Sequence, residues 1–291
     1  MKNTNTNTNP ARTVLVLGAT GKTGRRVVRI LRGAGVTVRA ASRSGEVRFD
    51  WTEPATWAGA LDGASAVYLV APDEVYDAVP RFVAQAVAAG VGRFVALSGR
   101  GIEHVGEDFG QGMAAAEEAV RASGAEWAVV RPNNFFQNFD EDLWRQPLRD
   151  GRLALPIGDV PEAFIDADDV AEVAAKLLTR PRAEHADGVY EISGPRALTF
   201  REAVAAMARA AGRAIDFVEL TPEEYHAELL AAGHPEVTAR AFGALFALHR
   251  EGHTAAPVPG VRDLLDRAPS DFETYAKKVA ATGAWTPKAT S

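Results

Sequence analysis

The sequence predicts an α/β fold in which a doubly wound parallel sheet is joined to a smaller, mostly helical C-terminal region. Two observations predict it. Through the first two-thirds of the chain, apolar runs of strand length alternate with helical stretches, and a glycine-rich turn separates the first run from the first helix. The runs are apolar on both faces, which is typical of parallel strands covered by helices on both sides. Strand–helix–strand repetition at this spacing therefore indicates an open parallel sheet.

The elements of the predicted sheet follow one another along the chain without a long linker. The runs expected to form strands are 13–18, 36–42, 66–71, 93–98 and 126–132. The stretches expected to form the helices between them, each ending near a glycine, are 22–34, 74–89 and 111–123.

The last part of the chain is mostly helical. One helix is expected with Asp168 as its N-cap and another with Thr199, because both side chains can accept a hydrogen bond from the first helical turn. Two further helices are expected at 221–233 and 235–252, and both have proline at their start. The segment 188–193 has the composition of a strand and is expected to return to the sheet.

The composition is that of an ordinary globular protein. Of the 291 residues, 47% are hydrophobic and 24% are charged. No apolar run approaches the roughly 18 residues that span a membrane, and we expect no signal peptide and no membrane partner. Cysteine is absent, which excludes disulfides, thiolate nucleophiles and cysteine-ligated zinc. We expect a cytoplasmic monomer or homodimer.

Charge is distributed unevenly along the chain. The net charge is −6, yet nine Lys or Arg residues precede the first acidic residue, Glu46. A basic segment on an otherwise acidic protein predicts a small anionic ligand bound locally, rather than a nucleic-acid surface.

The turn after the first predicted strand has the spacing GxxGxxG, formed by Gly18, Gly21 and Gly24. It contains "GKT", but an NTP-binding P-loop needs a further glycine where Val16 stands, inside the strand. A dinucleotide site fits the context, with a strand before the turn and a helix after it. The first glycine permits the turn, the second lets the backbone approach a pyrophosphate, and the third lets the helix pack on the strand.

The end of the second predicted strand indicates which dinucleotide is bound. An NAD site usually has an Asp or Glu there, which holds the ribose hydroxyls. Here the chain reads Ser42, Arg43, Ser44, without a carboxylate. A guanidinium can pair with a 2′-phosphate, so NADP is expected, and NAD remains the alternative.

These patterns divide the chain into three parts. Residues 1–11 are a polar repeat and are expected to form a disordered tail. Residues 12–155 are expected to form an NAD(P)-binding Rossmann domain. Residues 156–291 are expected to form a substrate-binding region over the carboxyl edge of the sheet, where open α/β folds bind ligands.

Several motifs together resemble one protein family. "GATGKTGRRVV", "ASRSG", "FDW", "VYLVAP", "RFVALSG", "RPNNFFQNF", "FIDADDVAEVAAKLLT" and "ISGPRALTF" are similar to the NmrA-like atypical short-chain dehydrogenases/reductases. Within that family the chain looks most like the ergot-alkaloid dehydrogenase branch. The resemblance covers nearly the whole chain and is specific for the fold and the dinucleotide, and less so for the substrate.

The resemblance implies roles for individual residues around a bound dinucleotide. Arg43 would meet the adenosine ribose, Asp50 and Trp51 would flank the adenine, and Ser98 would lie beside the nicotinamide. The residues implied at the pyrophosphate are Gly18, Thr20, Gly21, Lys22, Thr23 and Gly24. Those implied along the cofactor groove and over the nicotinamide are Ala71, Pro72, Pro132, Asn133, Asn134 and Phe135.

The chain departs from the superfamily at the catalytic pair Tyr-xxx-Lys. Alignment on "EEAVRASG" places Phe109 where tyrosine is expected and Met113 where lysine is expected. A phenyl ring and a thioether cannot donate a proton, so carbonyl reduction through a tyrosine acid is excluded. Ser98 and His104 are the remaining candidates for a catalytic role.

Residues on both sides of the fifth predicted strand, most of them aromatic or apolar, are expected to line a substrate pocket. The residues of this predicted pocket are Phe109, Met113, Asn134, Phe135, Phe136 and Trp144. His249 and His253 have a metal-like spacing but lack a suitable carboxylate motif, so we expect solvated histidines at a helix end and no metal site.

Taken together, the residues and the resemblance imply an NAD(P)H-dependent oxidoreductase that acts on a small conjugated, apolar substrate. Quinones, iminium ions and polycyclic aromatic natural-product intermediates accept hydride without a tyrosine acid. Two alternatives are an oxygen-inserting enzyme of an aromatic polyketide pathway and a non-enzymatic redox sensor that binds NADP to regulate a partner.

Overall fold

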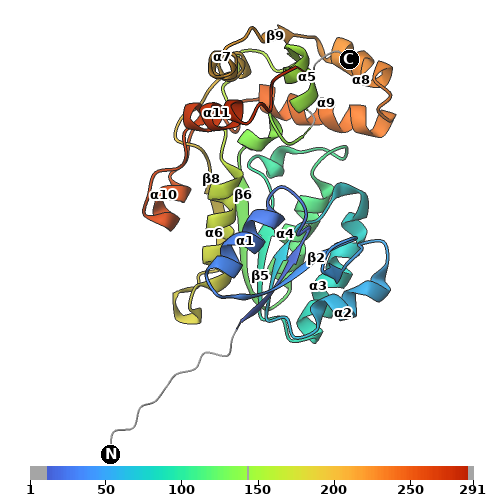
Figure 1. Cartoon of the computed structure of the whole chain (residues 1–291). Coiled ribbons are helices and arrows are strands. Elements are labelled where there is room, and N and C mark those ends of the chain that lie inside the picture. Colours follow the sequence, from blue (N-terminus) through green and yellow to red (C-terminus); the bar gives the residue numbers. More distant parts are fainter. Residues whose placement is uncertain (1–11, 143, 288–291) are drawn as a thin grey trace, which may run out of the picture.

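The computed structural model describes residues 12–142 and 144–287. It consists of a lobe built around a parallel sheet and a mostly helical lobe stacked on one end of that sheet (Figure 1). The tail predicted at 1–11 lies outside the described residues. In the two described ranges, no helix has the length and apolar character needed to cross a membrane.

The main sheet has seven strands, and all of their pairings are parallel. β1 lies between β2 and β4, with Val14 opposite Val38 and Ala66. The strand order therefore changes direction at β1, and a crevice at the carboxyl ends is expected beside such a point. In spatial order the strands are β3 (Val47–Arg48), β2 (Thr37–Ser42), β1 (Thr13–Leu17), β4 (Ala66–Leu69), β5 (Arg93–Leu97), β6 (Glu126–Pro132) and β8 (Gly188–Ile192).

Side chains of β1 show why its sequence is apolar throughout. Val14 and Val16 pack with α1 and α6 on one face of the sheet, whereas Leu15 and Leu17 pack with α2, α3 and α4 on the other. All four side chains are fully buried. The helices that cover the two faces are α1 (Gly24–Gly33), α2 (Trp57–Leu61), α3 (Val79–Ala88), α4 (Gln111–Ala122) and α6 (Ala167–Thr179).

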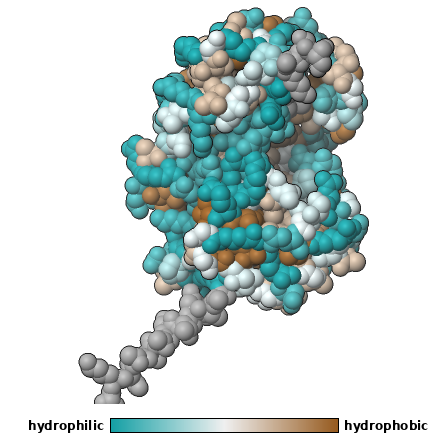
Figure 2. Space-filling view, in the orientation of Figure 1, coloured by the Kyte–Doolittle hydropathy of each residue, from teal (hydrophilic) through white to brown (hydrophobic). Residues whose placement is uncertain are grey.

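The second lobe has its own core, in which aromatic rings predominate. Its two strands, β7 (Arg152–Leu155) and β9 (Asp216–Glu219), form a separate parallel pair. The viewed face of the molecule is mostly hydrophilic, with some apolar patches on the sheet lobe (Figure 2). The helices of this lobe are α5 (Arg145–Asp150), α7 (Phe200–Ala211), α8 (Pro222–Ala231), α9 (Glu236–Arg250) and α11 (Phe272–Ala281), and α10 (Gly260–Leu265) lies beside α6 and β8.

The chain passes from the sheet to the second lobe and back before it ends. α5 and β7 leave the sheet lobe, and then α6 and β8 return to it, with β8 paired to β6. The sheet lobe therefore contains segments on both sides of residue 156. Short 3-10 turns complete the connections: η1 (Pro54–Thr56), η2 (Asp73–Ala78), η3 (Ile102–His104), η4 (Phe136–Asn138) and η5 (Arg182–Glu184).

The helix expected from residue 74 begins as the 3-10 turn η2, and α3 itself starts at Val79. Of the two expected caps, one is confirmed and one is wrong. Thr199 caps α7, and its backbone N–H and hydroxyl bond reciprocally with Glu202 in a capping box. The prediction that Asp168 caps α6 is wrong, because the side chain of Asp166 accepts the hydrogen bond from the backbone N–H of Asp168. Asp166 has the extended backbone that an N-cap requires, and Asp168 is already in the first turn.

Candidate functional site

A cleft lies where the carboxyl ends of the sheet strands meet α9 of the second lobe. Its volume is about 350 Å³. Its wall is apolar over most of its area and has a polar corner where β6 ends. The lining residues are Lys22, Val70, Ala71, Pro72, Asp73, Leu97, Ser98, Gly99, Arg100, Ile102, Val105, Phe109, Met113, Pro132, Asn133, Asn134, Phe135, Asn138, Glu162, Leu245, Leu248, His249 and Thr254.

The glycine turn between β1 and α1 reaches this cleft through Lys22. Gly18 has φ +62°, a left-handed conformation that glycine adopts without strain. A Cβ on Gly24 would lie 2.2 Å from the carbonyl oxygen of Gly18, so helix and strand approach too closely for any side chain. The first turn of α1 contains no acidic residue. The N-terminus of α1 is therefore suited to an anionic group such as a pyrophosphate.

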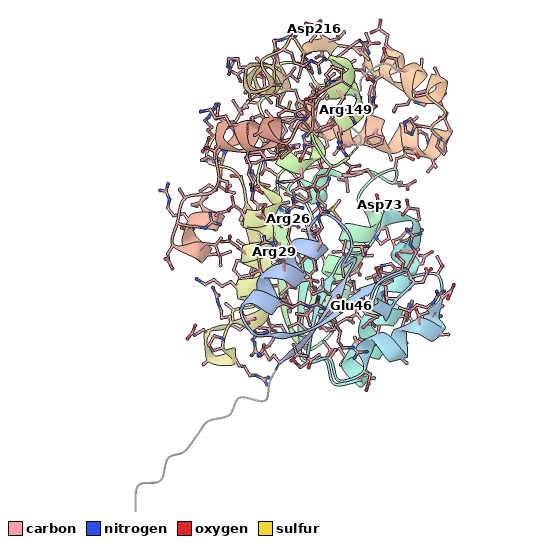
Figure 3. All side chains as sticks on the ribbon, viewed as in Figure 1. Arg26, Arg29, Glu46, Asp73, Arg149 and Asp216 are labelled. Atoms are coloured by element: carbon pink, nitrogen blue, oxygen red, sulfur yellow. The ribbon has the colours of Figure 1, made fainter. Side chains whose placement is uncertain are left out.

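Most of the basic side chains that precede Glu46 are neutralised within the protein. Arg26 and Arg29 on α1 (labelled in Figure 3) pair with Asp168, and Arg26 also pairs with Glu141. Arg32 pairs with Glu46. The excess of positive charge in this segment therefore serves largely to bind acidic residues from later in the chain, and by itself it is not evidence of a ligand.

Arg43 is an exception to this pairing. It is exposed at the end of β2 and makes no ion pair or hydrogen bond with another residue of the described ranges. Nearby, Asp50 uses its carboxylate to accept hydrogen bonds from the backbone N–H and hydroxyl of Thr52. Trp51 packs edge to face against Phe49, with ring centroids 5.1 Å apart. Arg43 is therefore available to a phosphate at this end of the turn.

The hydroxyl of Ser98 lines the cleft, but its proton is directed elsewhere. Ser98 Oγ donates to Glu117 Oε1 at 2.6 Å, and Arg131 holds both oxygens of that carboxylate at 2.8 Å. Burial acts to raise the pKa of Glu117, but hydrogen bonds from Arg131 and Ser98 outweigh it and the pKa is lowered. Because Glu117 is ionised and accepts the proton of Ser98, the serine presents an acceptor to the cleft and is poorly placed to donate.

Phe109 and Met113 both line the cleft, at the start of α4. Asp73 holds this end of the helix, because its carboxylate accepts hydrogen bonds from the backbone N–H groups of Gly110 and Gly112 at 2.8 and 2.9 Å. Asp73 lies in the turn after β4 (labelled in Figure 3). The two apolar side chains are thus fixed beside Ser98, where they contribute packing surface and no proton.

The polar corner of the cleft is built around a buried carboxylate. Glu162 is 2% exposed, and its Oε2 lies 3.2 Å from Nδ1 of His249. Its Oε1 accepts from Asn133 Nδ2 at 2.7 Å and from the backbone N–H of Asn134 at 3.2 Å. Thr254 donates its hydroxyl to Oε2 at 2.5 Å. The side chain of Glu162 therefore joins three parts of the chain: the segment before α6, the end of β6 and the end of α9.

The other ring nitrogen of His249 faces a carboxamide. His249 Nε2 lies 2.6 Å from Nδ2 of Asn134, and Asn138 Nδ2 reaches Oδ1 of Asn134 at 3.3 Å. Lys22 Nζ donates to Oδ1 of Asn138 and pairs with Asp142 at 2.9 Å. A line of polar side chains therefore runs along the cleft wall from the glycine turn to Glu162.

The sequence of the chain matches the model of the NmrA-like family over residues 10–276. It belongs to the NmrA-like family. An NAD(P)H azoreductase of Xenophilus azovorans is 33% identical over 285 residues, which cover 92% of this chain and 98% of the relative. Agroclavine dehydrogenase of Claviceps fusiformis is 29% identical over 291 residues, which cover 90% and 96%. The family expected from the motifs is confirmed.

A solved structure shares the fold of this NmrA-like protein. Triphenylmethane reductase of Citrobacter sp., complexed with NADP(H), superposes with a TM-score of 0.74 at 19% identity, over 92% of this chain and 99% of that chain. The doubly wound sheet predicted from the sequence is confirmed, and this solved structure shares the fold.

The NmrA-like chain brings many of the predicted site residues together. Those that line the cleft are Lys22, Ala71, Pro72, Ser98, Phe109, Met113, Pro132, Asn133, Asn134 and Phe135. The remaining predicted cofactor residues lie in the β1–α1 turn or near the ends of β2 and β3: Gly18, Thr20, Gly21, Thr23, Gly24, Arg43, Asp50 and Trp51.

Three residues predicted in the substrate pocket or in catalysis lie outside the cleft lining. Phe136 and Trp144, predicted in the substrate pocket, are 1% and 4% exposed in the aromatic core of the second lobe. They lie there because η4 turns the chain after Phe135, so the next aromatic side chains face Phe139 and Phe272. His104 stacks on His253 with ring centroids 3.7 Å apart and is not among the residues that line the cleft.

Sequence reasoning missed Glu162 and His249 as site residues. The expectation of a solvated histidine is wrong for His249, which is 6% exposed. One signal was available in the sequence: His249 follows Leu245 and Leu248 at helical spacing, so it lies on the apolar face of α9. A polar side chain on such a face needs a buried partner, but the sequence does not say which.

Proposed function

We propose that this NmrA-like protein is an NAD(P)H-dependent oxidoreductase that transfers hydride to a conjugated, largely apolar small molecule in the cleft. One observation carries the proposal: apolar side chains of the sheet lobe and of α9 enclose a cleft that begins at the glycine turn. Phe109 and Met113 come from one side, and Leu245 and Leu248 from the other. A flat, conjugated molecule suits walls of this kind.

NADP is the cofactor that the residues favour. The first turn of α1 lacks acidic residues, and Gly24 allows the helix to approach the strand. Arg43 makes no ion pair with the residues that the structure describes. Arg43 would hold the 2′-phosphate, and the turn from Gly18 to Gly24 would hold the pyrophosphate. When bound, the dinucleotide supplies the hydride, and the protein orients the partners and keeps water away.

The substrate class follows from the chemistry that the cleft allows. Phe109 and Met113 supply no acid, and the proton of Ser98 is taken by Glu117. Conjugated acceptors such as quinones, iminium ions and polycyclic aromatic intermediates take up hydride without the tyrosine acid. Among the relatives, the names azoreductase and triphenylmethane reductase also denote reactions of conjugated molecules, which supports this class.

The alternative of a non-enzymatic redox sensor would be favoured by a filled C-terminal region. The cleft of about 350 Å³ instead leaves room for a small molecule beside the cofactor turn. The open cleft therefore favours a reductase over a redox sensor.

The test is an assay of cofactor oxidation with purified protein. NADPH and NADH are each supplied with a quinone, a cationic triphenylmethane dye and an azo dye, and oxidation of the reduced cofactor is followed by its absorbance. We expect oxidation with at least one acceptor, faster with NADPH than with NADH. Gly21→Asp is the control, since a carboxylate against the pyrophosphate should abolish both binding and turnover. Absence of oxidation by the wild type with every acceptor would contradict the proposal.

A further inference from the structure

The cleft contains an imidazole that is oriented by a buried carboxylate. His249 and Glu162 both line the cleft and are 6% and 2% exposed. The groups that hydrogen-bond to the carboxylate of Glu162 are all donors. They are the side-chain amide of Asn133, the backbone N–H of Asn134 and the hydroxyl of Thr254. A carboxylate surrounded in this way is held in one position, and the imidazole beside it is held in one orientation.

Glu162 remains negatively charged in spite of its burial. Burial raises the pKa of this carboxyl, but the neighbouring His249 and the hydrogen bonds from His249, Thr254 and Asn134 together lower it below its ordinary value. The carboxylate of Glu162 lies 3.2 Å from Nδ1 of His249 and therefore fixes the orientation of the ring. The pair thus has the arrangement in which a carboxylate supports an imidazole that gains and loses a proton.

The partner of the second nitrogen is compatible with both charge states of the ring. Asn134 can donate its NH₂ group to Nε2 when the ring is neutral, and can turn its oxygen toward Nε2–H when the ring is protonated. Asn134 lines the cleft and is partly exposed. A substrate oxygen that takes the place of its carboxamide would lie within hydrogen-bond reach of Nε2.

The other polar side chains along the described cleft wall are committed to other roles. Asp73 accepts from two backbone N–H groups, and the proton of Ser98 is given to Glu117. Arg100 donates to Asn133 Oδ1 and to the carbonyl of Ala256, and a guanidinium does not release its proton near neutral pH. Lys22 is held by Asn138 and Asp142. Imidazole is the side chain that exchanges protons near neutral pH, which leaves His249 as the donor.

We propose that His249 is the proton donor to the reduced substrate, in place of the absent tyrosine, and that Glu162 is its positioning residue. The inference rests on the proposed reductase function. With a quinone, the nicotinamide loses a hydride and is oxidised, and the quinone gains that hydride and becomes a hydroquinone anion. The anion takes the proton from Nε2 of His249, which becomes neutral and then recovers a proton from water. With a cationic dye, hydride transfer to the central carbon yields a neutral product, and no proton is needed.

The test compares these two kinds of acceptor in the same variants. Rates of NADPH oxidation are measured with a quinone and with a cationic triphenylmethane dye for the wild type, His249→Gln and Glu162→Gln. We expect His249→Gln to slow quinone reduction about 100-fold and to leave the dye rate within about twofold, because only the first reaction needs an acid. Glu162→Gln should lower the ratio of quinone rate to dye rate in the same direction, by about tenfold. A loss of packing alone would slow both acceptors and leave that ratio unchanged.

Two controls keep the result interpretable. His253→Gln changes an exposed histidine four residues away and should leave both rates unchanged. His249→Ala tests the donor directly, since added imidazole should restore quinone reduction if the ring itself supplies the proton. Thermal denaturation and NADPH binding show whether each variant is folded.

The outcomes separate this inference from the function on which it rests. Three outcomes would overturn the assignment of His249 and leave the reductase function intact. They are an equal slowing of quinone and dye reduction, an unchanged rate of quinone reduction in His249→Gln, and a lack of rescue by imidazole in His249→Ala. A wild type that reduces the dye and not the quinone would also overturn it, since a cleft with a proton donor should serve the neutral acceptor. A wild type that fails to oxidise NADPH with every acceptor tested would overturn the reductase function itself.

Discussion

Gly24→Ala is the substitution that tests most directly how α1 is joined to β1. In the structure the added Cβ would lie 2.2 Å from the carbonyl oxygen and 2.7 Å from the carbonyl carbon of Gly18. Both are backbone atoms, so neither can move aside as the end of a side chain could. Ordinary contacts of a Cβ begin near 3.4 Å, so the helix must shift by about 1.2 Å relative to the strand end.

The cost follows from the buried contacts that such a shift disturbs. α1 packs through Val27 and Leu31 against the core shared with α6, and both side chains are buried. Overpacking of a buried contact costs about 1–3 kcal/mol. For a chain somewhat larger than 250 residues, each kcal/mol corresponds to roughly 2–4 °C. We therefore expect a fall in Tm of about 2–12 °C. We also expect at least a tenfold rise in the Kd for NADPH, because the shift displaces the turn that would hold the pyrophosphate.

A matched control lies at the other end of the same helix. A Cβ on Gly33 would meet no atom within 4 Å, and Gly33 is the last residue of α1. Gly33→Ala should leave NADPH binding unchanged and should raise stability by up to about 0.5 kcal/mol, through the better helix propensity of alanine. The assay is thermal denaturation by circular dichroism, with NADPH binding by calorimetry. If Gly24→Ala were as stable as Gly33→Ala and bound NADPH equally well, the close approach of helix and strand would be refuted.

Three further predictions concern the cofactor, the cleft and the buried carboxylate. Arg43→Ala should weaken NADPH binding about tenfold and NADH binding little, since only NADPH has a 2′-phosphate; equal effects in calorimetry would contradict the role of Arg43. Phe135→Ala should raise KM or abolish turnover. Phe109→Tyr should change turnover little, and a large gain in turnover from the added hydroxyl would show that the cleft lacked an acid. Because the pKa of Glu162 is lowered in the folded state, the stability it contributes is present above its ordinary value of 4.5 and is lost as the pH falls through the lowered value. Acid titration of the unfolding free energy should therefore be shallower in Glu162→Gln than in the wild type, and parallel curves would show that the carboxylate does not titrate as inferred.

The paired arginines of α1 show that the basic segment mainly forms ion pairs within the protein. In the sequence, nine basic residues precede the first acidic one, which favours an anionic ligand. In the structure Arg26 and Arg29 meet Glu141 and Asp168, which lie more than a hundred positions later in the chain. A linear charge count cannot include those carboxylates, because the fold decides which segments become neighbours. In the described part of the basic segment, Arg43 makes no ion pair or hydrogen bond, and this becomes informative only once its neighbours on α1 are known to be paired.

The sequence alone determined the features of this protein that depend on neighbouring residues. The doubly wound sheet follows from apolar runs of strand length, the turn at Gly18 from the glycine spacing, and the start of α7 from the cap at Thr199. The turn and the cap are set by backbone geometry and hydrogen bonding within a few positions. The sheet pairs strands that are far apart in the chain, but the regular alternation of strand and helix patterns indicates it. The absence of the tyrosine–lysine pair was also visible in the sequence, because Met113 lies in the first turn of α4 and Phe109 lies just before its N-cap.

Only the tertiary structure decided what surrounds the cleft. His249 meets Glu162 and Asn134 because α9 docks over the carboxyl ends of the strands, and the aromatic core of the second lobe determines that docking. The same core takes Phe136 and Trp144 away from the cleft, although both look like pocket residues in the sequence. Contacts between segments far apart in the chain depend on how whole elements pack, and packing is a property of the complete set of side chains rather than of any one stretch.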